Sequence, residues 1–255
     1  MQHRPRKRFG QHFLHDQRVI GKILAAILPL PGESLVEIGP GLGAISLPLL
    51  ERCGALTAIE LDRDVIPELQ ASAAGKGALR IIQADALKTD ISALAPAGGK
   101  LRLVGNLPYN ISTPLLFHFL EYAHHVTDMH FMLQKEVVER MAASPGGKEY
   151  GRLTVMLAAR CKVQPLFNIG SGAFRPPPKV ESSFVRLVPY AVPPFLIPDR
   201  ARFARIVTGA FSHRRKTLRN ALAGLVDETA IRAAGIDPGT RPETLSAEDY
   251  ARLST

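Results

Sequence analysis

The stretch Leu35-Val36-Glu37-Ile38-Gly39-Pro40-Gly41-Leu42-Gly43 decides the fold of this 255-residue chain. Its first four residues include three apolar ones and predict a short buried strand, and three closely spaced glycines follow directly. Glycine lets the backbone approach a ligand without a Cβ atom in the way, and a helix that begins there offers unpaired N–H groups. The stretch therefore predicts a strand, a ligand-binding turn and a helix.

Short apolar runs alternate with helix-compatible segments on both sides of this stretch. The runs are rich in Ile, Val and Leu, as strands buried on both faces of a sheet are. They span residues 35–38, 55–61, 79–82, 101–104, 129–133, 163–169 and 183–188. Helices are expected over residues 19–28, 44–52, 65–72 and 114–122. Because strands and helices alternate, we expect an α/β fold with a mostly parallel sheet and helices on both faces.

The composition changes after Pro189. Four prolines within residues 189–198 indicate a linker, and beyond it apolar residues recur at helical spacing as far as Gly235. We therefore expect a larger α/β domain over residues 1–189 and a small all-helical domain over residues 190–255.

The overall composition excludes several classes of protein. With 46% hydrophobic and 22% charged residues the chain is typical of a globular protein, and its apolar stretches fall well short of the roughly 20 residues that cross a bilayer. Cys53 and Cys161 lack CxxC spacing, which indicates reduced thiols in a cytoplasmic protein rather than a disulfide framework or a zinc site. The net charge of +9 suggests a polyanionic partner.

Two acidic residues follow the glycine-rich turn, each at the end of a later strand. Glu60 stands 21 residues after Gly39, where it can accept hydrogen bonds from both hydroxyls of a ribose, and Asp85 could accept one from an adenine amino group. The glycine spacing is G-x-G-x-G, preceded by Glu37, whereas dinucleotide sites use G-x-G-x-x-G. This set resembles the class I methyltransferase pattern, with a Rossmann-like fold. The resemblance implies S-adenosyl-L-methionine as the cofactor, bound at Gly39, Gly41, Glu60 and Asp85.

The fourth strand runs into Asn106-Leu107-Pro108-Tyr109, which resembles the signature of methyltransferases that act on amino nitrogens attached to planar rings. The lone pair of such an amine is delocalised into the ring, so the amine is a poor nucleophile. The side-chain oxygen of Asn106 and the carbonyl of Leu107 could accept both N–H bonds and stabilise the positive charge that develops during transfer. Pro108 would keep the turn rigid, and Tyr109 would stack on a flipped-out base.

Six blocks of the sequence resemble the bacterial small-subunit (16S) ribosomal RNA adenine N6-dimethyltransferases. They span residues 9–14, 36–43, 105–113, 131–136, 173–180 and 213–220. The resemblance implies transfer of two methyl groups to each of two adjacent adenosines in a hairpin loop near the 3′ end of 16S ribosomal RNA. It also implies action on a nearly assembled small subunit, and we expect a cytoplasmic monomer that binds no membrane.

The same resemblance implies further site residues. It places His12, Leu14 and Asn106 at the cofactor, and it suggests Phe174 as a second aromatic face for the target base. The family usually has Asn where this chain has His12 and His15, so the contact of His12 is expected to be sensitive to pH.

Basic residues gather at Arg4–Arg8 and again over residues 200–219, where Asp199 alone opposes them nearby. We expect Arg214, Arg215 and Lys216 to contact RNA phosphates, which position the RNA without reading its sequence.

Two other functions stay open at this point. One is methylation of large-subunit ribosomal RNA by a related family, although residues 105–113 and the His-Arg-Arg-Lys block at 213–216 favour the small-subunit type. The other is an RNA-binding assembly factor without turnover, against which the intact Asn106, Pro108 and Tyr109 argue.

Overall fold

The computed structural model describes residues 12–213 and 215–255. The chain divides into two compact units, one of residues up to Val138 with Gln164–Pro189, the other of Glu139–Val163 with Tyr190–Thr255. This division differs from the expected domains 1–189 and 190–255, because residues 139–163 belong with the C-terminal helices. None of the helices in the described ranges combines the length and apolar character needed to span a membrane.

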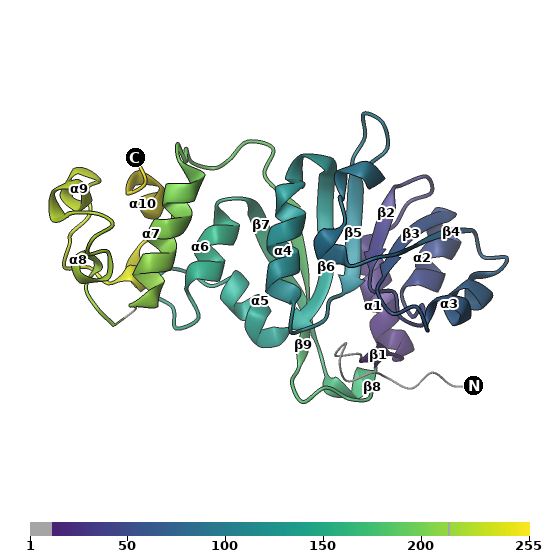
Figure 1. The fold of residues 1–255 in the computed structure, drawn as a ribbon. Coiled ribbons are helices and arrows are strands. Elements are labelled where there is room, and N and C mark those ends of the chain that lie inside the picture. The colour runs from purple at the N-terminus through teal and green to yellow at the C-terminus, as the bar shows by residue number, and fades with distance from the viewer. Residues whose placement is uncertain (1–11, 214) are drawn as a thin grey trace. The chain divides into compact units, whose positions relative to one another are not determined.

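A seven-stranded sheet forms the centre of the first unit, in the order β4-β3-β2-β5-β6-β9-β7 (Figure 1). Its strands are β2 (Leu35–Ile38), β3 (Ala55–Glu60), β4 (Ala78–Gln83), β5 (Leu101–Asn106), β6 (Val126–Gln134), β7 (Cys161–Ile169) and β9 (Ser182–Pro189). The pairs from β4 through β6 are parallel, and β9 runs antiparallel to β6. The expected mostly parallel sheet is therefore confirmed.

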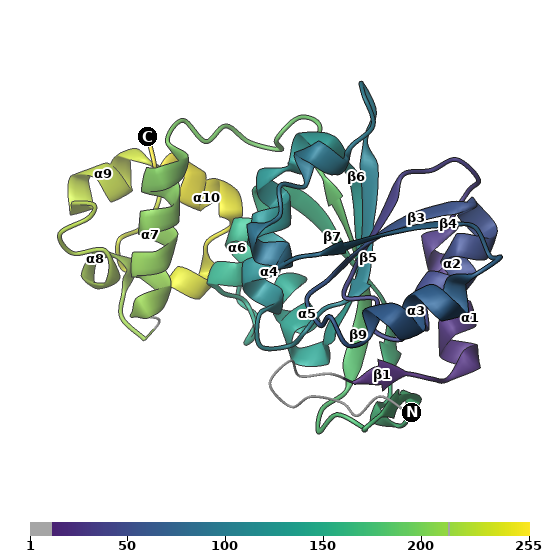
Figure 2. The same cartoon turned by 45° about the vertical axis from the view of Figure 1, so that its right-hand side comes forward.

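Helices cover both faces of this sheet. In Figure 2, α1 (Gln17–Ile27) and α2 (Ser46–Cys53) lie on one side and α4 (Ser112–Glu121) lies on the other. The first unit also holds α3 (Ile66–Ala73) and the start of α5 (Lys135–Met141). α1 shows why these segments are helical: Asp16 caps it by accepting from the backbone N–H of Arg18 and Val19, and its buried side chains recur every three or four residues. They enter the core cluster that also contains Leu49 and Leu50 of α2.

Two short strands escaped the sequence analysis. β1 (Phe13–Leu14) pairs antiparallel with β8 (Phe174–Arg175), with Phe13 opposite Arg175 and Leu14 opposite Phe174. The backbone N–H of His15 extends this contact by donating to the carbonyl of Ala173 at 2.9 Å. This pairing holds Phe13 and Leu14 next to the start of the proline-rich loop, which follows Arg175.

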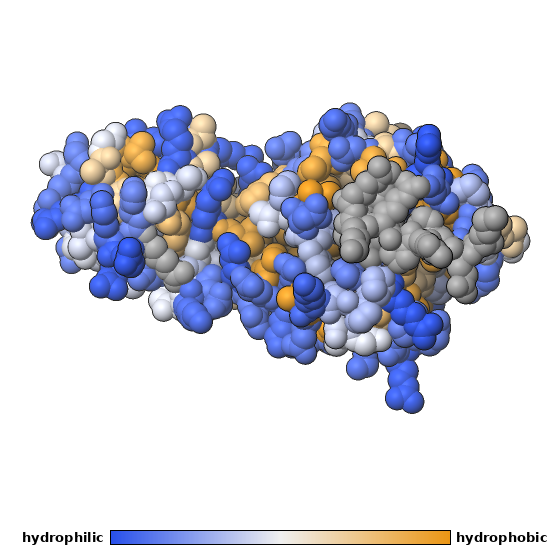
Figure 3. All heavy atoms as spheres, turned by 60° about the horizontal axis from the view of Figure 1, so that its bottom comes forward, coloured by the Kyte–Doolittle hydropathy of each residue, from blue (hydrophilic) through white to orange (hydrophobic). Residues whose placement is uncertain are grey.

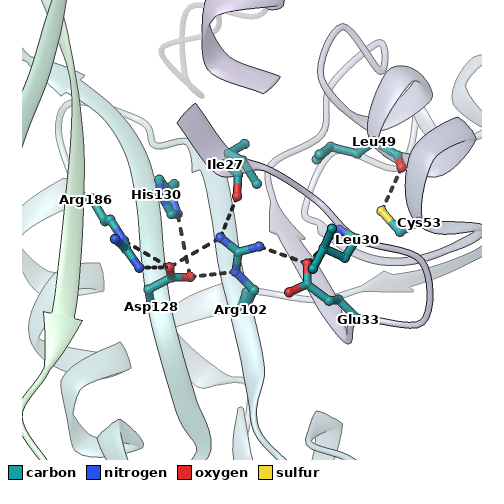
Figure 4. A network of polar contacts seen from close by, with 9 residues as sticks. All are labelled: Ile27, Leu30, Glu33, Leu49, Cys53, Arg102, Asp128, His130 and Arg186. Carbon is teal, nitrogen blue, oxygen red and sulfur yellow. Dashed lines mark hydrogen bonds and ion pairs between the residues drawn. The ribbon is translucent and has the colours of Figure 1, made fainter. Parts of the chain in front are cut away.

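A polar network joins the amino-terminal ends of β5 and β6 (Figure 4). Asp128 is almost fully buried and accepts from Arg102 Nε at 2.8 Å and from Arg186 Nη2 at 2.7 Å. Arg102 also donates to Glu33 at 2.9 Å. Burial alone would raise the pKa of Asp128, but its hydrogen bonds and proximity to Arg102 outweigh that effect and lower it. The network lies away from the glycine-rich turn and ties three strands together.

The second unit consists of helices around an aromatic cluster. Its helices are α6 (Arg152–Ala158), α7 (Arg200–Ser212), α8 (Leu218–Ala221), α9 (Glu228–Ala233) and α10 (Ala247–Arg252). The ring of Phe211 contacts those of Tyr150 and Tyr250, and the Tyr150 hydroxyl donates to the carbonyl of Leu245 at 2.7 Å. These contacts explain why residues 139–163 group with the C-terminal helices, since Tyr150 is buried among them.

Candidate functional site

A cavity of about 1990 Å³ opens at the carboxyl ends of the parallel strands β2 to β5. Ligands of open α/β sheets bind at this edge, because the loops after the strands converge there. Figure 3 looks from below β1 and β8 of Figure 1, onto a face where hydrophobic patches interrupt a hydrophilic surface. All predicted cofactor contacts line the cavity, namely His12, Leu14, Gly39, Gly41, Glu60, Asp85 and Asn106. The structure thus brings together residues that lie up to 94 positions apart in the sequence.

The glycine-rich turn forms one wall of the cavity. Gly39 and Gly41 have φ values of 66° and 54°, in the left-handed region that favours glycine. A Cβ atom on Gly41 would lie 3.1 Å from the ring of Phe13, which packs directly over the turn. The turn therefore depends on glycine both for its backbone conformation and for its contact with β1.

Glu60 holds the turn in place at the end of β3. Its carboxylate is 6% exposed and accepts from the backbone N–H of Gly41 at 3.1 Å and from that of Asp62 at 2.8 Å. Burial raises the pKa of Glu60. Each carboxylate oxygen has a second lone pair with which it can accept a hydrogen bond from a ligand.

Glu37 lies beside it at the end of β2 and also lines the cavity. Its side chain is 2% exposed, and its Oε2 atom has no hydrogen-bond partner among the described residues. Burial, with a smaller contribution from the negative charge of Glu60, raises the pKa of Glu37 to about 7. From the sequence, Glu37 is predicted only as part of the glycine-rich pattern and not as a site residue.

Asp85 follows β4 and caps the short 3₁₀ helix Ala86–Lys88. Its Oδ1 atom accepts from the backbone N–H of Leu87 at 3.0 Å. The side chain is half-buried at the cavity wall, which leaves Oδ2 as the carboxylate oxygen that can accept from a ligand.

The turn Asn106–Tyr109 forms the opposite wall. The backbone N–H of Leu107 donates to the carbonyl of Met132 at 3.2 Å, so the turn stays attached to β6. The side-chain Nδ2 of Asn106 donates to the carbonyl of His12 at 3.1 Å. Because the amide nitrogen is engaged in this way, the amide oxygen is the atom left to accept a hydrogen bond.

The side chain of Tyr109 is held by contacts to its hydroxyl and to its ring. Its hydroxyl shares a hydrogen bond of 2.6 Å with the buried Ser182 Oγ, and its ring stacks on that of His12 with centroids 5.9 Å apart and planes inclined by 24°. Burial raises the pKa of Tyr109. The Nδ1–H of His12 donates to the carbonyl of Pro176 at 2.8 Å. The contacts of Ser182 and His12 with Tyr109 could not be predicted from the sequence, because they join segments far apart in the chain.

The structure does not place Phe174 at the cavity. Its side chain is 1% exposed, belongs to the hydrophobic core cluster and does not line the cavity. The pairing of β8 with β1 sets Phe174 opposite the buried Leu14, so the ring packs in the core, and its stacking on a target base stays a prediction.

The predicted phosphate contacts lie in the second unit. Arg215 and Lys216 are exposed between α7 and α8, while Arg214 and the basic residues Arg4–Arg8 lie outside the described residues. Their role stays a prediction.

The chain is similar to known proteins over nearly its whole length. The family model described as "Ribosomal RNA adenine dimethylase" matches residues 2–255. The Ribosomal RNA small subunit methyltransferase A of Nitrosococcus oceani is 56% identical over 254 residues, which cover 99% of this chain and 96% of that protein. The protein of the same name from Acinetobacter baylyi is 54% identical over 252 residues, covering 99% and 92%.

Solved structures are similar to the chain in fold. A dimethyladenosine transferase from Plasmodium falciparum superposes with a TM-score of 0.79 and 26% identity, covering 95% of this chain and 96% of that one. The 23S rRNA methyltransferase ErmE shares the fold with a TM-score of 0.73 at 24% identity, covering 95% and 98%. The match to the family model over nearly the whole length, together with these identities, shows that the chain belongs to the ribosomal RNA adenine dimethylase family.

Proposed function

We propose that the chain transfers methyl groups from S-adenosyl-L-methionine to the N6 amines of two adjacent adenosines in a 3′-terminal hairpin loop of 16S ribosomal RNA. The products would be N6,N6-dimethyladenosines. The observation that carries the proposal is the orientation of Asn106, whose nitrogen is engaged by His12 so that its oxygen can accept at the cavity wall. The names of the relatives at 54–56% identity support a small-subunit RNA as the substrate.

The cavity fits this cofactor. Gly39 lines the cavity with backbone alone, and the buried Glu37 has an oxygen that lacks a partner among the described residues, which suits a cationic ligand. Glu60 would accept the ribose hydroxyls and Asp85 Oδ2 the adenine amine. His12 and Leu14 line the same cavity and would border the remainder of the molecule. When bound, the cofactor supplies an activated methyl group on a sulfonium.

The residues of the Asn106–Tyr109 turn would prepare the target amine. The Asn106 oxygen and the Leu107 carbonyl would accept its two N–H bonds, which favours a pyramidal nitrogen and stabilises the positive charge that develops on it. Tyr109 would stack on the flipped-out base and hold it in the plane that these acceptors require. A strong general base is unnecessary, because the nitrogen loses a proton readily once it is cationic.

The partner would be 16S ribosomal RNA within a pre-30S particle, on which the chain acts in the cytoplasm as a monomer during subunit maturation. Arg215 and Lys216, with Arg214, would contact phosphates and position the RNA. Loop shape and stacking on Tyr109 would then select the target.

Methyl transfer from labelled cofactor to undermethylated 30S subunits tests the proposal. We expect incorporation at two adjacent adenosines of 16S RNA and none into 50S subunits or bare 23S RNA. Labelling of 23S RNA would favour the large-subunit reaction, and the absence of any transfer would favour a non-catalytic assembly factor.

A further inference from the structure

The ring of His12 lies directly against Tyr109, the aromatic residue of the catalytic turn. The ring centroids are 5.9 Å apart and the planes are inclined by 24°, which is within the range for two aromatic rings in contact. A base stacked between them would need more room than this separation gives. The face of Tyr109 that His12 covers is therefore not the face that receives the target base.

Two further contacts fix the His12 ring where it is. Its Nδ1–H donates to the carbonyl of Pro176 at 2.8 Å, and the residue that follows it, Phe13, is paired in β1 with Arg175. Tyr109 is fixed independently at its other end, because its hydroxyl bonds to the Oγ of Ser182, which is 0% exposed. The Tyr109 ring is thus held by its hydroxyl and by one face, and the half-buried residue also lines the cavity.

We propose that His12 is a positioning residue that backs the ring of Tyr109, so that the target adenine stacks on the opposite face of that ring. This role rests on the proposed function. It does not involve Phe174, whose ring is in the core. Prior ordering of Tyr109 lowers the entropic cost of each base-binding event, because the ring need not be immobilised when the RNA arrives.

Side-chain changes at position 12 can separate this role from the others. The contact with Asn106 uses the backbone carbonyl of residue 12, so every substitution there retains it. His12→Phe keeps a stacked ring and loses the hydrogen bond to Pro176, His12→Asn keeps a donor and loses the ring, and His12→Ala loses both. Each variant would be assayed for methyl transfer to undermethylated 30S subunits and for cofactor affinity by calorimetry.

We expect kcat/KM for the RNA to fall about tenfold in His12→Ala and His12→Asn, the effect of ordering one side chain at each binding event. His12→Phe should recover most of this loss, and with the cofactor at saturating concentration the fall in His12→Ala and His12→Asn should exceed any change in cofactor affinity. A defect in His12→Phe as large as that in His12→Ala would overturn the proposal. So would full activity of His12→Ala, or a loss of cofactor affinity that accounts for the whole defect.

A fluorescence measurement on the free protein tests the contact without relying on catalysis. The chain contains no Trp, so Tyr109→Trp introduces a single indole in contact with His12. We expect its emission to change when His12→Ala is added, because the indole loses its stacked partner and gains solvent. Unchanged emission would overturn the role of His12 and leave the proposed function intact. If the unaltered chain transferred no methyl group to 30S subunits, the proposed function and the role of His12 would both be overturned.

Discussion

The side-chain amide of Asn106 donates to the backbone carbonyl of His12 across 3.1 Å. This bond joins the end of β5 to the residue before β1, and it sets which end of the amide can accept from a ligand. The orientation of the Asn106 amide therefore depends on a main-chain atom, which side-chain variation at position 12 does not remove.

Asn106→Ala should lower methyl transfer by a factor of about 10² to 10³, the usual effect of removing one preorganised group that stabilises transition-state charge. Cofactor affinity, measured by calorimetry, should change far less. Asn106→Asp serves as a matched variant, because a carboxylate would face the His12 carbonyl without a proton to donate; we expect it to be similarly inactive. Equal losses of activity and cofactor affinity would show that Asn106 only binds the cofactor.

Glu60→Ala should weaken cofactor binding by about 1–3 kcal/mol, the cost of leaving buried donors without an acceptor. The effect has two sources, since the carboxylate also accepts from the backbone N–H groups of Gly41 and Asp62 that shape the turn. Calorimetric titration with S-adenosyl-L-methionine measures it, and Glu121→Ala, at an exposed position on α4, controls for the change in charge. Unaltered affinity would remove Glu60 from the cofactor site.

The strands and the strand-end residues could be predicted from the sequence because local patterns determine them. Leu35–Ile38 is buried at every position, as its mostly apolar sequence predicts. Glu60 is the last residue of the next strand, β3, as the apolar run before it predicts. Phe174 could not be placed, because its burial depends on the pairing of a two-residue strand with Leu14, 160 positions away in the chain. The contacts of His12 and Ser182 with Tyr109, and the hydrogen bond from the Tyr150 hydroxyl to the Leu245 carbonyl, are likewise long-range and leave no periodic signal.

Glu37 should make the cofactor-free protein less stable as the pH rises. Its pKa is raised from 4.5 to about 7, so the folded state favours the protonated form. The resulting stabilisation is fully present below pH 4.5 and is lost as the pH rises through 7. Glu37→Gln, which stays neutral, should therefore be more stable than the unaltered chain at pH 8, by up to about 3 kcal/mol, but not at pH 4.5. Urea unfolding at the two pH values measures this; a pH-independent difference would contradict it.

His130 should make the protein less stable as the pH falls, the opposite of the effect of Glu37. Its ring is 1% exposed, stacks on Phe184, and has no hydrogen-bond partner for either nitrogen among the described residues. Burial, together with the charges of Arg102 and Arg186, lowers its pKa from 6.5 to about 4 despite the nearby Asp128. Its contribution to stability is present above pH 6.5 and is lost as the pH falls through 4.

His130→Phe has no imidazole to protonate, so it should not lose stability in this way as the pH falls. The difference in free energy of unfolding between His130→Phe and the protein with His130 should therefore change by about 3 kcal/mol in favour of His130→Phe between pH 6.5 and 4. Both proteins should carry Glu37→Gln, because Glu37 titrates in the same range with the opposite sign. Urea unfolding across this range gives the difference. If the difference were constant with pH, protonation of His130 would not be the cause.

Replacing Arg214, Arg215 and Lys216 together by Gln should flatten the salt dependence of binding to the 30S subunit. Each lost phosphate contact lowers the slope of log K against log salt concentration by about 0.7 to 0.9, so three contacts should lower it by about 2. Arg232→Gln is a suitable control within the same unit, because Arg232 is exposed and already paired with Glu228 at 2.7 Å. Filter binding at several salt concentrations measures both slopes. A triple variant with the slope of the unaltered chain would place the RNA interface elsewhere on the protein.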